Sequence, residues 1–507
     1  MPARLTMFVL SLTLIALTAG CNLPTTEIST QSGISPRIGE SVGPSVDFFW
    51  FLPERQDLSN PIPSPTPDPI RTINQIRDYE TSYTVQVNDT LGSIARRFAV
   101  TVDALAEANQ ISDPNILSVG QYLVIPAPIP GEPAPDLKLI PDSELVNGPF
   151  NSFFDLAGFI ESKNGQLAIH QEEVDGVLMS GAQIVERVAT DYSVNPRLLL
   201  ALLEYQTGWL TTIPAHLEAL SFPIGNPDPD RTSLYLQLTW AANTLNAGYY
   251  RWRVNALDYY RMTNGVLVPA SPQVNAGTAA LHYFFSQLQD DGVWRQSVSA
   301  DGFLQTYQTL FGYPFDWSVE PLIPPDLTQP VFQLPFEPGV SWIFTGGPHG
   351  GWADGSAWSA LDFAPPSEVL GCVQNENWVV AVADGLIVRT GEGAVVQDLD
   401  GDGYEQTGWT VLYMHIESRE RVAEGTYLHT GERVGHPSCE GGYSTGTHVH
   451  IARRYNGEWV AINSSIPFVM DGWTAVDTGE YYGGYLQKGD KIIEPCECTE
   501  IENMIQR

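Results

Sequence analysis

Two proline-rich stretches divide this 507-residue chain into parts that must fold separately. The first covers residues 21–80 and is richest in the run from Pro61 to Pro67, where every second residue is proline. The second covers residues 127–148. Such segments bury too little apolar surface to fold and favour extended conformations. We therefore expect a tether in the first stretch, a linker in the second, and folded domains after each.

The first twenty residues have the composition of an export signal. Arg4 precedes an apolar run over residues 5–17, and three small residues, 18–20, come directly before Cys21. The run is shorter than the ~20 residues that a membrane-spanning helix needs, which makes a transmembrane segment the weaker interpretation. Small residues before a cysteine resemble a bacterial lipoprotein signal, in which Cys21 is lipidated. Ordinary secretion is the alternative, and both interpretations predict export to the cell envelope or beyond it.

The charge balance excludes one class of partner. The chain has 59 acidic and 25 basic side chains, a formal net charge of −34 at pH 7. Nucleic-acid binding needs a clustered positive surface, which such a balance does not favour. We expect an envelope or extracellular protein that binds no nucleic acid.

Residues 81–126 contain a short module with two strand patterns and two helical patterns. Asp89 or Thr90 can cap the first helix. This order, together with the Asp-Thr-Leu sequence at residues 89–91 and a Gly-Gln-x-Leu-x-Ile-Pro ending, resembles a LysM module. The strands are expected over residues 83–87 and 120–126, and the helices over residues 91–98 and 102–109.

The LysM resemblance implies binding of glycans that contain N-acetylglucosamine. In such modules the start of the first helix and the loop before the second strand line the groove. The alternative, that these positions are only core and turn residues, stays open for each of them. The candidate glycan contacts are Asp89, Thr90, Leu91, Asn115, Ile116 and Leu117.

Residues 149–325 have helical periodicity and predict a mainly α-helical domain. The segment 196–204 weakly resembles the catalytic helix of lysozyme-like lytic transglycosylases, in which a Glu-Ser-Gly sequence supplies the acid. The matching place here is Gln206-Thr207-Gly208, and an amide cannot donate the proton that a glycosidase acid supplies. We expect this domain to hold glycan or to act as a spacer, and Glu204 to have a surface or capping role.

From residue 326 to about 480 the chain changes to short strands separated by glycine and proline. Near the end of this region a glycine-rich loop leads into His448 and His450. Val449 and Ile451 indicate a strand, on which the two imidazoles point to the same face. A pair of strand histidines is weak support for a site when it stands alone.

Three upstream residues make the histidine pair significant. His349 lies in a glycine-rich loop, Asp362 in an apolar strand pattern, and His415 at the end of another strand pattern. Two histidines and one carboxylate with an open fourth position are typical of a catalytic zinc site, where the pKa of water falls to ~7. Two further histidines can transfer a proton and stabilise an oxyanion.

The order and flanks of these residues resemble the M23 zinc endopeptidases of peptidoglycan. In the commoner branch of that family the first histidine stands four residues before the aspartate, where this chain has Trp358. The separation here is 362 − 349 = 13 residues, as in the staphylolysin and beta-lytic endopeptidase branch, whose members favour glycine-containing bonds. The resemblance implies that the zinc ligands are His349, Asp362 and His450, and that the catalytic histidines are His415 and His448. Five other histidines match no motif and are expected at the surface: His170, His216, His282, His429 and His436.

Residues Asp398, Asp400 and Asp402 space their carboxylates as calcium loops do. An EF-hand loop also needs a bidentate glutamate at its twelfth position, which is Trp409 here. We favour a hairpin turn, with Ca²⁺ as the alternative.

Four cysteines lie in the last third of the chain, and an even number in an exported protein indicates disulfides. Cys496 and Cys498, in the C-terminal tail of residues 481–507, are expected to reach back to Cys372 and Cys439, although spacing does not fix the pairing.

The sequence therefore predicts a multidomain, lipid-anchored wall hydrolase: a small βααβ LysM module, a mainly α-helical middle domain and a β-rich, antiparallel M23 peptidase domain. Its partners would be peptidoglycan, through both end domains, and the membrane, through the lipid anchor. The alternatives are a non-catalytic activator of other wall hydrolases and a plain glycan-binding adhesin. The complete zinc ligand set favours the enzyme.

Overall fold

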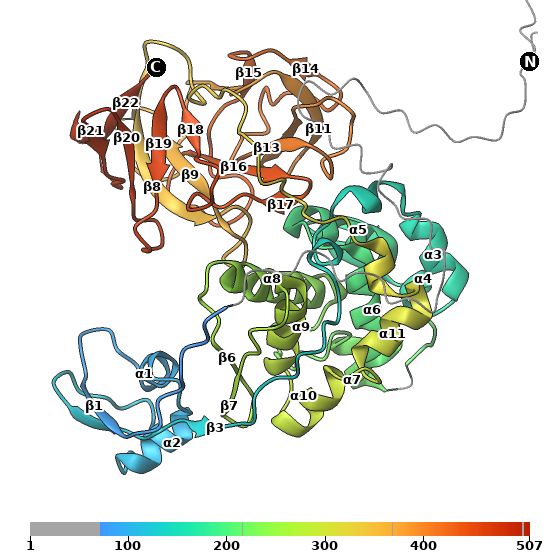
Figure 1. Cartoon of the computed structure of the whole chain (residues 1–507). Helices are drawn as coiled ribbons and strands as arrows, with labels where there is room; N and C mark the ends of the chain where they lie inside the picture. Colours follow the sequence, from blue (N-terminus) through green and yellow to red (C-terminus); the bar gives the residue numbers. More distant parts are fainter. Residues whose placement is uncertain (1–70, 215, 368, 499–500) are drawn as a thin grey trace, which may run out of the picture. The chain divides into compact units, whose positions relative to one another are not determined.

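The computed structural model describes residues 71–507 apart from residues 215, 368, 499 and 500 (Figure 1). The predicted export signal, Cys21 and the tether up to residue 70 lie outside the described residues and stay predictions. Within the described part of the chain, no helix combines the length and the hydropathy that a membrane span requires.

The N-terminal module has the predicted βααβ order, and its two strands pair antiparallel. Thr90 begins the first helix through a capping box, because its hydroxyl accepts the N–H of Ser93 while the Ser93 hydroxyl accepts the N–H of Thr90. The Asn109 amide closes the module by donating to and accepting from the backbone of Val124. The elements are β1 (Thr81–Thr84), α1 (Leu91–Arg97), α2 (Val102–Ala108) and β2 (Tyr122–Ile125).

The middle domain is mainly α-helical, as predicted, and contains two short β-hairpins. Strand β3 (Ile129–Pro130) pairs in parallel with one of them. The elements of the domain are η2 (Asp142–Glu144), η3 (Pro149–Phe153), α3 (Leu156–Lys163), α4 (Gln166–Ile169), β4 (Gln171–Val174), β5 (Val177–Ser180), α5 (Gly181–Tyr192), α6 (Pro196–Thr207), α7 (Leu217–Ser221), α8 (Leu234–Arg253), β6 (Tyr259–Arg261), β7 (Val266–Pro269), α9 (Ala276–Ser286), α10 (Asp291–Ser297), α11 (Phe303–Phe311) and η4 (Pro314–Trp317).

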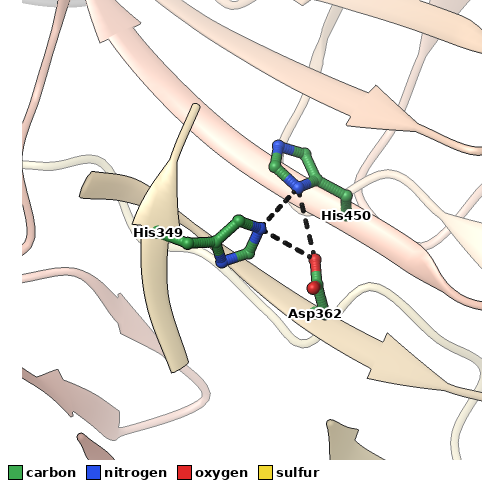
Figure 2. A group of neighbouring side chains, drawn as sticks. All are labelled: His349, Asp362 and His450. Atoms are coloured by element: carbon green, nitrogen blue, oxygen red, sulfur yellow. Dashed lines mark hydrogen bonds and ion pairs between the residues drawn. The ribbon is translucent and has the colours of Figure 1, made fainter. Parts of the chain in front are cut away.

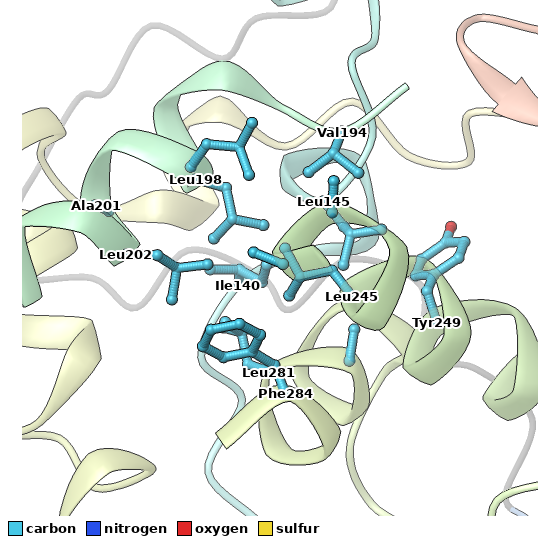
Figure 3. Close-up of a cluster of buried hydrophobic side chains, with 14 of the residues drawn as sticks. Ile140, Leu145, Val194, Leu198, Ala201, Leu202, Leu245, Tyr249, Leu281 and Phe284 are labelled. Carbon is cyan, nitrogen blue, oxygen red and sulfur yellow. The ribbon is translucent and has the colours of Figure 1, made fainter. Parts of the chain in front are cut away.

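Helix α6 lies in the core of the helical domain. It begins where the Asn195 side chain accepts the N–H of Arg197 and Pro196 sets the first helical φ, and it ends at Gly208 in a left-handed conformation. Figure 3 shows side chains of α6, α8 and α9 packed together. The labelled residues from these three helices are Leu198, Ala201, Leu202, Leu245, Tyr249, Leu281 and Phe284.

The start of the helical domain differs from the expected linker boundary. Leu139, Ile140, Leu145 and Val146 are fully buried in the core of this domain, although they fall within the predicted linker 127–148. Proline and charged residues interrupt the apolar pattern here, so the sequence did not predict that these positions are buried. Glu204 has the expected capping role, since its carboxylate accepts the backbone N–H groups that follow α6.

The β-rich domain is built on an antiparallel sheet with the order β14-β11-β12-β13-β16-β9-β8-β22, with β17 paired to β16. Figure 1 shows these strands in yellow to red. The elements are β8 (Ser341–Gly350), β9 (Trp358–Ala364), β10 (Val379–Val380), β11 (Gly385–Gly391), β12 (Ala394–Asp398), β13 (Trp409–Met414), β14 (Tyr427–Leu428), β15 (Arg433–Gly435), β16 (Val449–Tyr455), β17 (Glu458–Trp459), β18 (Val469–Met470), β19 (Trp473–Val476), β20 (Tyr485–Lys488), β21 (Lys491–Ile493), η5 (Ile501–Asn503) and β22 (Met504–Gln506).

The predicted C-terminal tail is an integral part of this domain. Strands β20 and β21 extend a second antiparallel sheet, and β22 pairs with β8 at the edge of the main sheet. The expected disulfide pairing is wrong: Cys372 is bonded to Cys439, and Cys496 to Cys498. The first bond joins two loops that are 67 residues apart, whereas the second closes a ring over one intervening residue.

Candidate active site

Three neighbouring strands carry the predicted metal ligands. His349 lies on β8, Asp362 on β9 and His450 on β16, and the sheet register places His450 directly opposite Asp362. The three side chains converge (Figure 2). His349 Nε2 lies 3.3 Å and His450 Nδ1 3.2 Å from Asp362 Oδ1, and the two nitrogens are 2.8 Å apart. All three residues are buried.

The hydrogen bonds of the two histidines show that this cluster fits a cation. Nδ1 of His349 faces the carbonyl of Gly347 at 2.8 Å, and Nε2 of His450 faces the carbonyl of Gly351 at 3.0 Å. A carbonyl can only accept, so each of these nitrogens carries the proton and the other nitrogen of each ring presents a lone pair. Two lone pairs and a carboxylate oxygen thus meet in a buried space, and a metal ion satisfies all three.

The approach of β8 to β9 depends on a glycine. A Cβ atom at Gly346 would lie 2.5 Å from Asp362 Oδ2, which is closer than any relaxed contact. Gly346 stands opposite Asp362 in the strand register. The absence of a side chain here leaves the space in which the carboxylate points toward the two imidazoles.

The predicted catalytic histidines lie beside the ligand cluster. His415 follows β13 and His448 precedes β16, and their ring centroids are 4.4 Å apart. Nδ1 of His415 donates to the carbonyl of Glu440, and Nδ1 of His448 donates to that of Gly446, at 2.8 and 2.7 Å. Nε2 of each ring is therefore the atom that can exchange a proton. His415 has φ +64°, a left-handed conformation that non-glycine residues adopt at a cost and mainly at functional sites.

Burial and neighbouring charges set the protonation of these groups. Burial lowers the pKa of His415 to about 3, so its imidazole is neutral at pH 7. Burial alone would raise the pKa of Asp362, but the positive charge of neighbouring imidazoles, when they are protonated, holds that pKa well below its usual range. The site therefore offers an ionised ligand and a neutral proton acceptor.

Asp362, His415, His448 and His450 form part of the wall of a cleft of about 530 Å³. All described residues that line it come from the range 343–498. Tyr482 and Glu497 are among the lining residues that were not identified from the sequence. Tyr482 stacks on the His349 ring with centroids 4.2 Å apart. Both residues lie in the segment interpreted as a tail, and neither belongs to a motif that could have marked it.

The acidic loop after β12 forms the hairpin turn that the sequence favours. The Asp398 carboxylate accepts the N–H groups of Asp400 and Gly403, and Asp402 accepts from Tyr404. The three aspartates also lie close enough together to share an ion. Calcium at this loop stays a prediction, which a calcium titration of thermal unfolding tests.

The remaining sequence-predicted positions have mixed outcomes. Of the glycan candidates, Leu91 packs into the module core, so only its backbone is available for contact. Asn115 and Ile116 are exposed on one loop, as such a role requires.

Among the histidines expected at the surface, His282 and His436 are buried, because the first packs between aromatic rings and the second against Trp378.

Three families match separate parts of the chain. The LysM domain matches residues 83–126, the N-terminal domain of LasA matches residues 138–325, and peptidase family M23 matches residues 369–462. The M23 match includes His415, His448 and His450 but begins after His349 and Asp362, which the sheet brings to the same place.

Curated relatives share these parts. Protease LasA of Pseudomonas aeruginosa is 24% identical over 310 residues, which span 57% of this chain and 69% of that protein. Beta-lytic metalloendopeptidase of Lysobacter enzymogenes is 27% identical over 154 residues, 30% of this chain and 83% of that protein. N-acetylmuramoyl-L-alanine amidase XlyA of Bacillus subtilis is 51% identical over 72 residues, 14% of this chain and 24% of that protein. A solved structure of the M23 metalloprotease pseudoalterin covers 35% of this chain and 99% of its own, with 22% identity and a TM-score of 0.29.

Proposed function

We propose that this chain, which is an M23 metalloendopeptidase with a LysM domain, is a zinc-dependent peptidoglycan endopeptidase held on the cell wall by that domain. The observation that carries the proposal is the convergence of His349, Asp362 and His450 as three buried lone-pair donors beside two further histidines. The similarity to LasA and to beta-lytic metalloendopeptidase supports a peptide bond of the wall as the substrate.

The three ligands would bind the metal ion, and backbone carbonyls orient the two histidines among them. Zinc bound by His349, Asp362 and His450 supplies Lewis acidity and a lowered pKa for water. The carbonyls of Gly347 and Gly351 hold the two imidazoles in the tautomers that this requires. The Asp362 carboxylate would neutralise part of the charge of a bound metal ion.

Proton transfer falls to His415 and His448. Their Nε2 atoms carry no proton when the rings are neutral, because Nδ1 of each is bonded to a backbone carbonyl. One of them can take a proton from the attacking water, and the imidazolium that results can return it to the leaving amine. The other can stabilise the oxyanion when it is an imidazolium, because its Nε2 then also carries a proton to donate.

The location of the enzyme follows from the N-terminal segment. We infer export from the apolar run over residues 5–17, with Cys21 as the lipid attachment site. The LysM domain would bind glycan through the first helix start and the loop at Asn115 and Ile116. Metabolic labelling with a fatty acid, compared between wild type and Cys21→Ala, tests the anchor.

Digestion of purified peptidoglycan tests the proposed function. We expect soluble fragments with new amino and carboxyl ends, and no new reducing sugar ends. A chelator should abolish release and added Zn²⁺ should restore it. His450→Ala should be inactive, whereas His429→Ala, which removes an exposed histidine, should retain activity. Release that appears only when another wall hydrolase is added would instead identify an activator.

A further inference from the structure

The segment from Pro495 to Cys498 forms part of the wall of the active-site cleft. The disulfide between Cys496 and Cys498 closes a ring that contains Glu497. The N–H of Cys496 donates to the carbonyl of Phe344 on β8, at 3.0 Å, which attaches the ring to the strand that carries His349. A closed and attached ring leaves Glu497 less backbone freedom than an open loop would, so its side chain is held at the cleft.

Glu497 has no role in holding the described fold together. Its side chain is exposed, and no hydrogen bond or ion pair joins it to another described residue. Glu497 and Tyr482 line the same cleft, and the Tyr482 ring stacks on that of His349. The carboxylate of Glu497 therefore borders the space beside the ligand cluster.

The charges of the cleft favour one kind of substrate group. None of the described residues that line it is a lysine or an arginine, and Asp362 and Glu497 are its carboxylates. Asp362 belongs to the metal cluster, so among the described lining residues Glu497 is the carboxylate available to a substrate. An ammonium group placed beside Glu497 would be attracted by its carboxylate.

We propose that Glu497 is a specificity-determining residue that pairs with a primary ammonium group of the wall peptide near the scissile bond. This inference rests on the proposed peptidoglycan endopeptidase function. The ammonium group can belong to the side chain of a diamino residue or to a free peptide N-terminus, since both present the same charge and the same three donors.

The test compares peptidoglycan before and after chemical N-acetylation of its free amines, with the full-length protein. For the wild type we expect acetylation to lower kcat/KM about fivefold, mainly by raising KM, as an ion pair at a partly exposed site would. Glu497→Gln should hydrolyse both substrates at the rate of wild type on the acetylated one. Glu494→Gln, on the same segment but outside the cleft lining, should behave as wild type. Equal thermal midpoints would show that the variants are folded.

Two results would overturn the inference. If acetylation affects wild type and Glu497→Gln equally, the ammonium group is not recognised by Glu497. If wild type releases nothing from either substrate, the proposed function fails and the inference fails with it. Short peptides that carry the amine on a side chain or at the N-terminus identify its source, because only the recognised arrangement should lose activity in Glu497→Gln.

Discussion

The hydrogen bonds of four histidines divide them into two kinds at the residue scale. In His349 and His450, one ring nitrogen presents a lone pair to the space beside Asp362, and the other nitrogen donates a hydrogen bond to a backbone carbonyl. His415 and His448 have the same kind of carbonyl bond, but the nitrogens that remain face the cleft beside the ligand cluster. Ligation and proton transfer are therefore separable by mutation.

We expect His448→Ala to keep its metal and to lose activity. The His448 Nε2 atom lies 3.8 Å from Asp362 Oδ1, outside the 3.2–3.3 Å cluster of the ligands, so its removal leaves all three metal donors in place. Loss of a general acid or base lowers kcat by about 10²–10⁴-fold. Metal analysis and peptidoglycan digestion measure the two properties separately. A variant that loses its metal would show that His448 is a ligand.

A second residue-scale prediction concerns His282, which is fully buried in the helical domain with no hydrogen-bond partner on either nitrogen among the described residues. Burial lowers its pKa from 6.5 to about 3. Above pH 6.5 neither the folded nor the unfolded state carries this proton, but between pH 6.5 and 3 only the unfolded state does. The free energy of unfolding therefore falls as the pH falls through this window.

At pH 5 this loss amounts to about 2 kcal/mol relative to pH 7. We expect His282→Phe, which keeps an aromatic ring beside Tyr260 and Trp294, to remove that part of the pH dependence. Urea unfolding at both pH values measures it. His216→Phe, at an exposed position of the same domain, is the control and should keep the wild-type dependence. An unchanged slope in His282→Phe would contradict the assignment.

At the scale of the elements, the site depends on how closely β8 and β9 approach each other. A methyl group at Gly346 would meet the Asp362 carboxylate at 2.5 Å, so Gly346→Ala should displace this ligand. We expect metal affinity to fall roughly 10–100-fold, the range typical when the support of a ligand is lost. Gly446→Ala, whose added atom would have its nearest contact at 3.6 Å, should bind metal normally. Equal metal affinity in both variants would show that the strands adjust.

The sequence predicted some elements well and others poorly, for physical reasons. Alternating apolar residues and flanking glycines identified the strands near Asp362 and His450, because every second residue of each strand packs into the core of the β-rich domain. The sequence did not predict the burial of residues 139–146, because a proline interrupts their apolar pattern. The sequence did not predict that the C-terminal tail belongs to the sheet. Strand β22 pairs with β8, more than 150 residues away in sequence, and no local pattern indicates such a pairing.

At the scale of the whole molecule, the tertiary fold brings residues to the cleft that no sequence motif marks. The five site residues could be predicted because their order is characteristic, whereas Tyr482 and Glu497 reach the cleft only through the tertiary fold. The disulfide partners could not be predicted either, since four cysteines allow several pairings and only the folded chain selects one. Residues 71–80, which sequence assigned to the tether, are described by the structure, and the rest of that tether is not.

We expect deletion of the LysM domain, residues 81–126, to weaken binding to insoluble peptidoglycan about tenfold or more, because a second attachment point raises the effective concentration of the first. Hydrolysis of a short soluble peptide should be unchanged, because all described residues that line the cleft come from the range 343–498, outside the deleted module. Co-sedimentation with peptidoglycan and a peptide assay measure the two effects. A parallel loss in both assays would contradict this division of tasks.

The central claim is that His349, Asp362 and His450 hold a catalytic zinc ion. Its most direct test is the metal content of the purified full-length protein beside that of His349→Ala, with peptidoglycan release measured on the same samples. We predict one zinc per wild-type chain with release, and neither metal nor release in a variant that remains folded. A folded, metal-free wild-type protein, or a variant that retains both zinc and release, would contradict the claim.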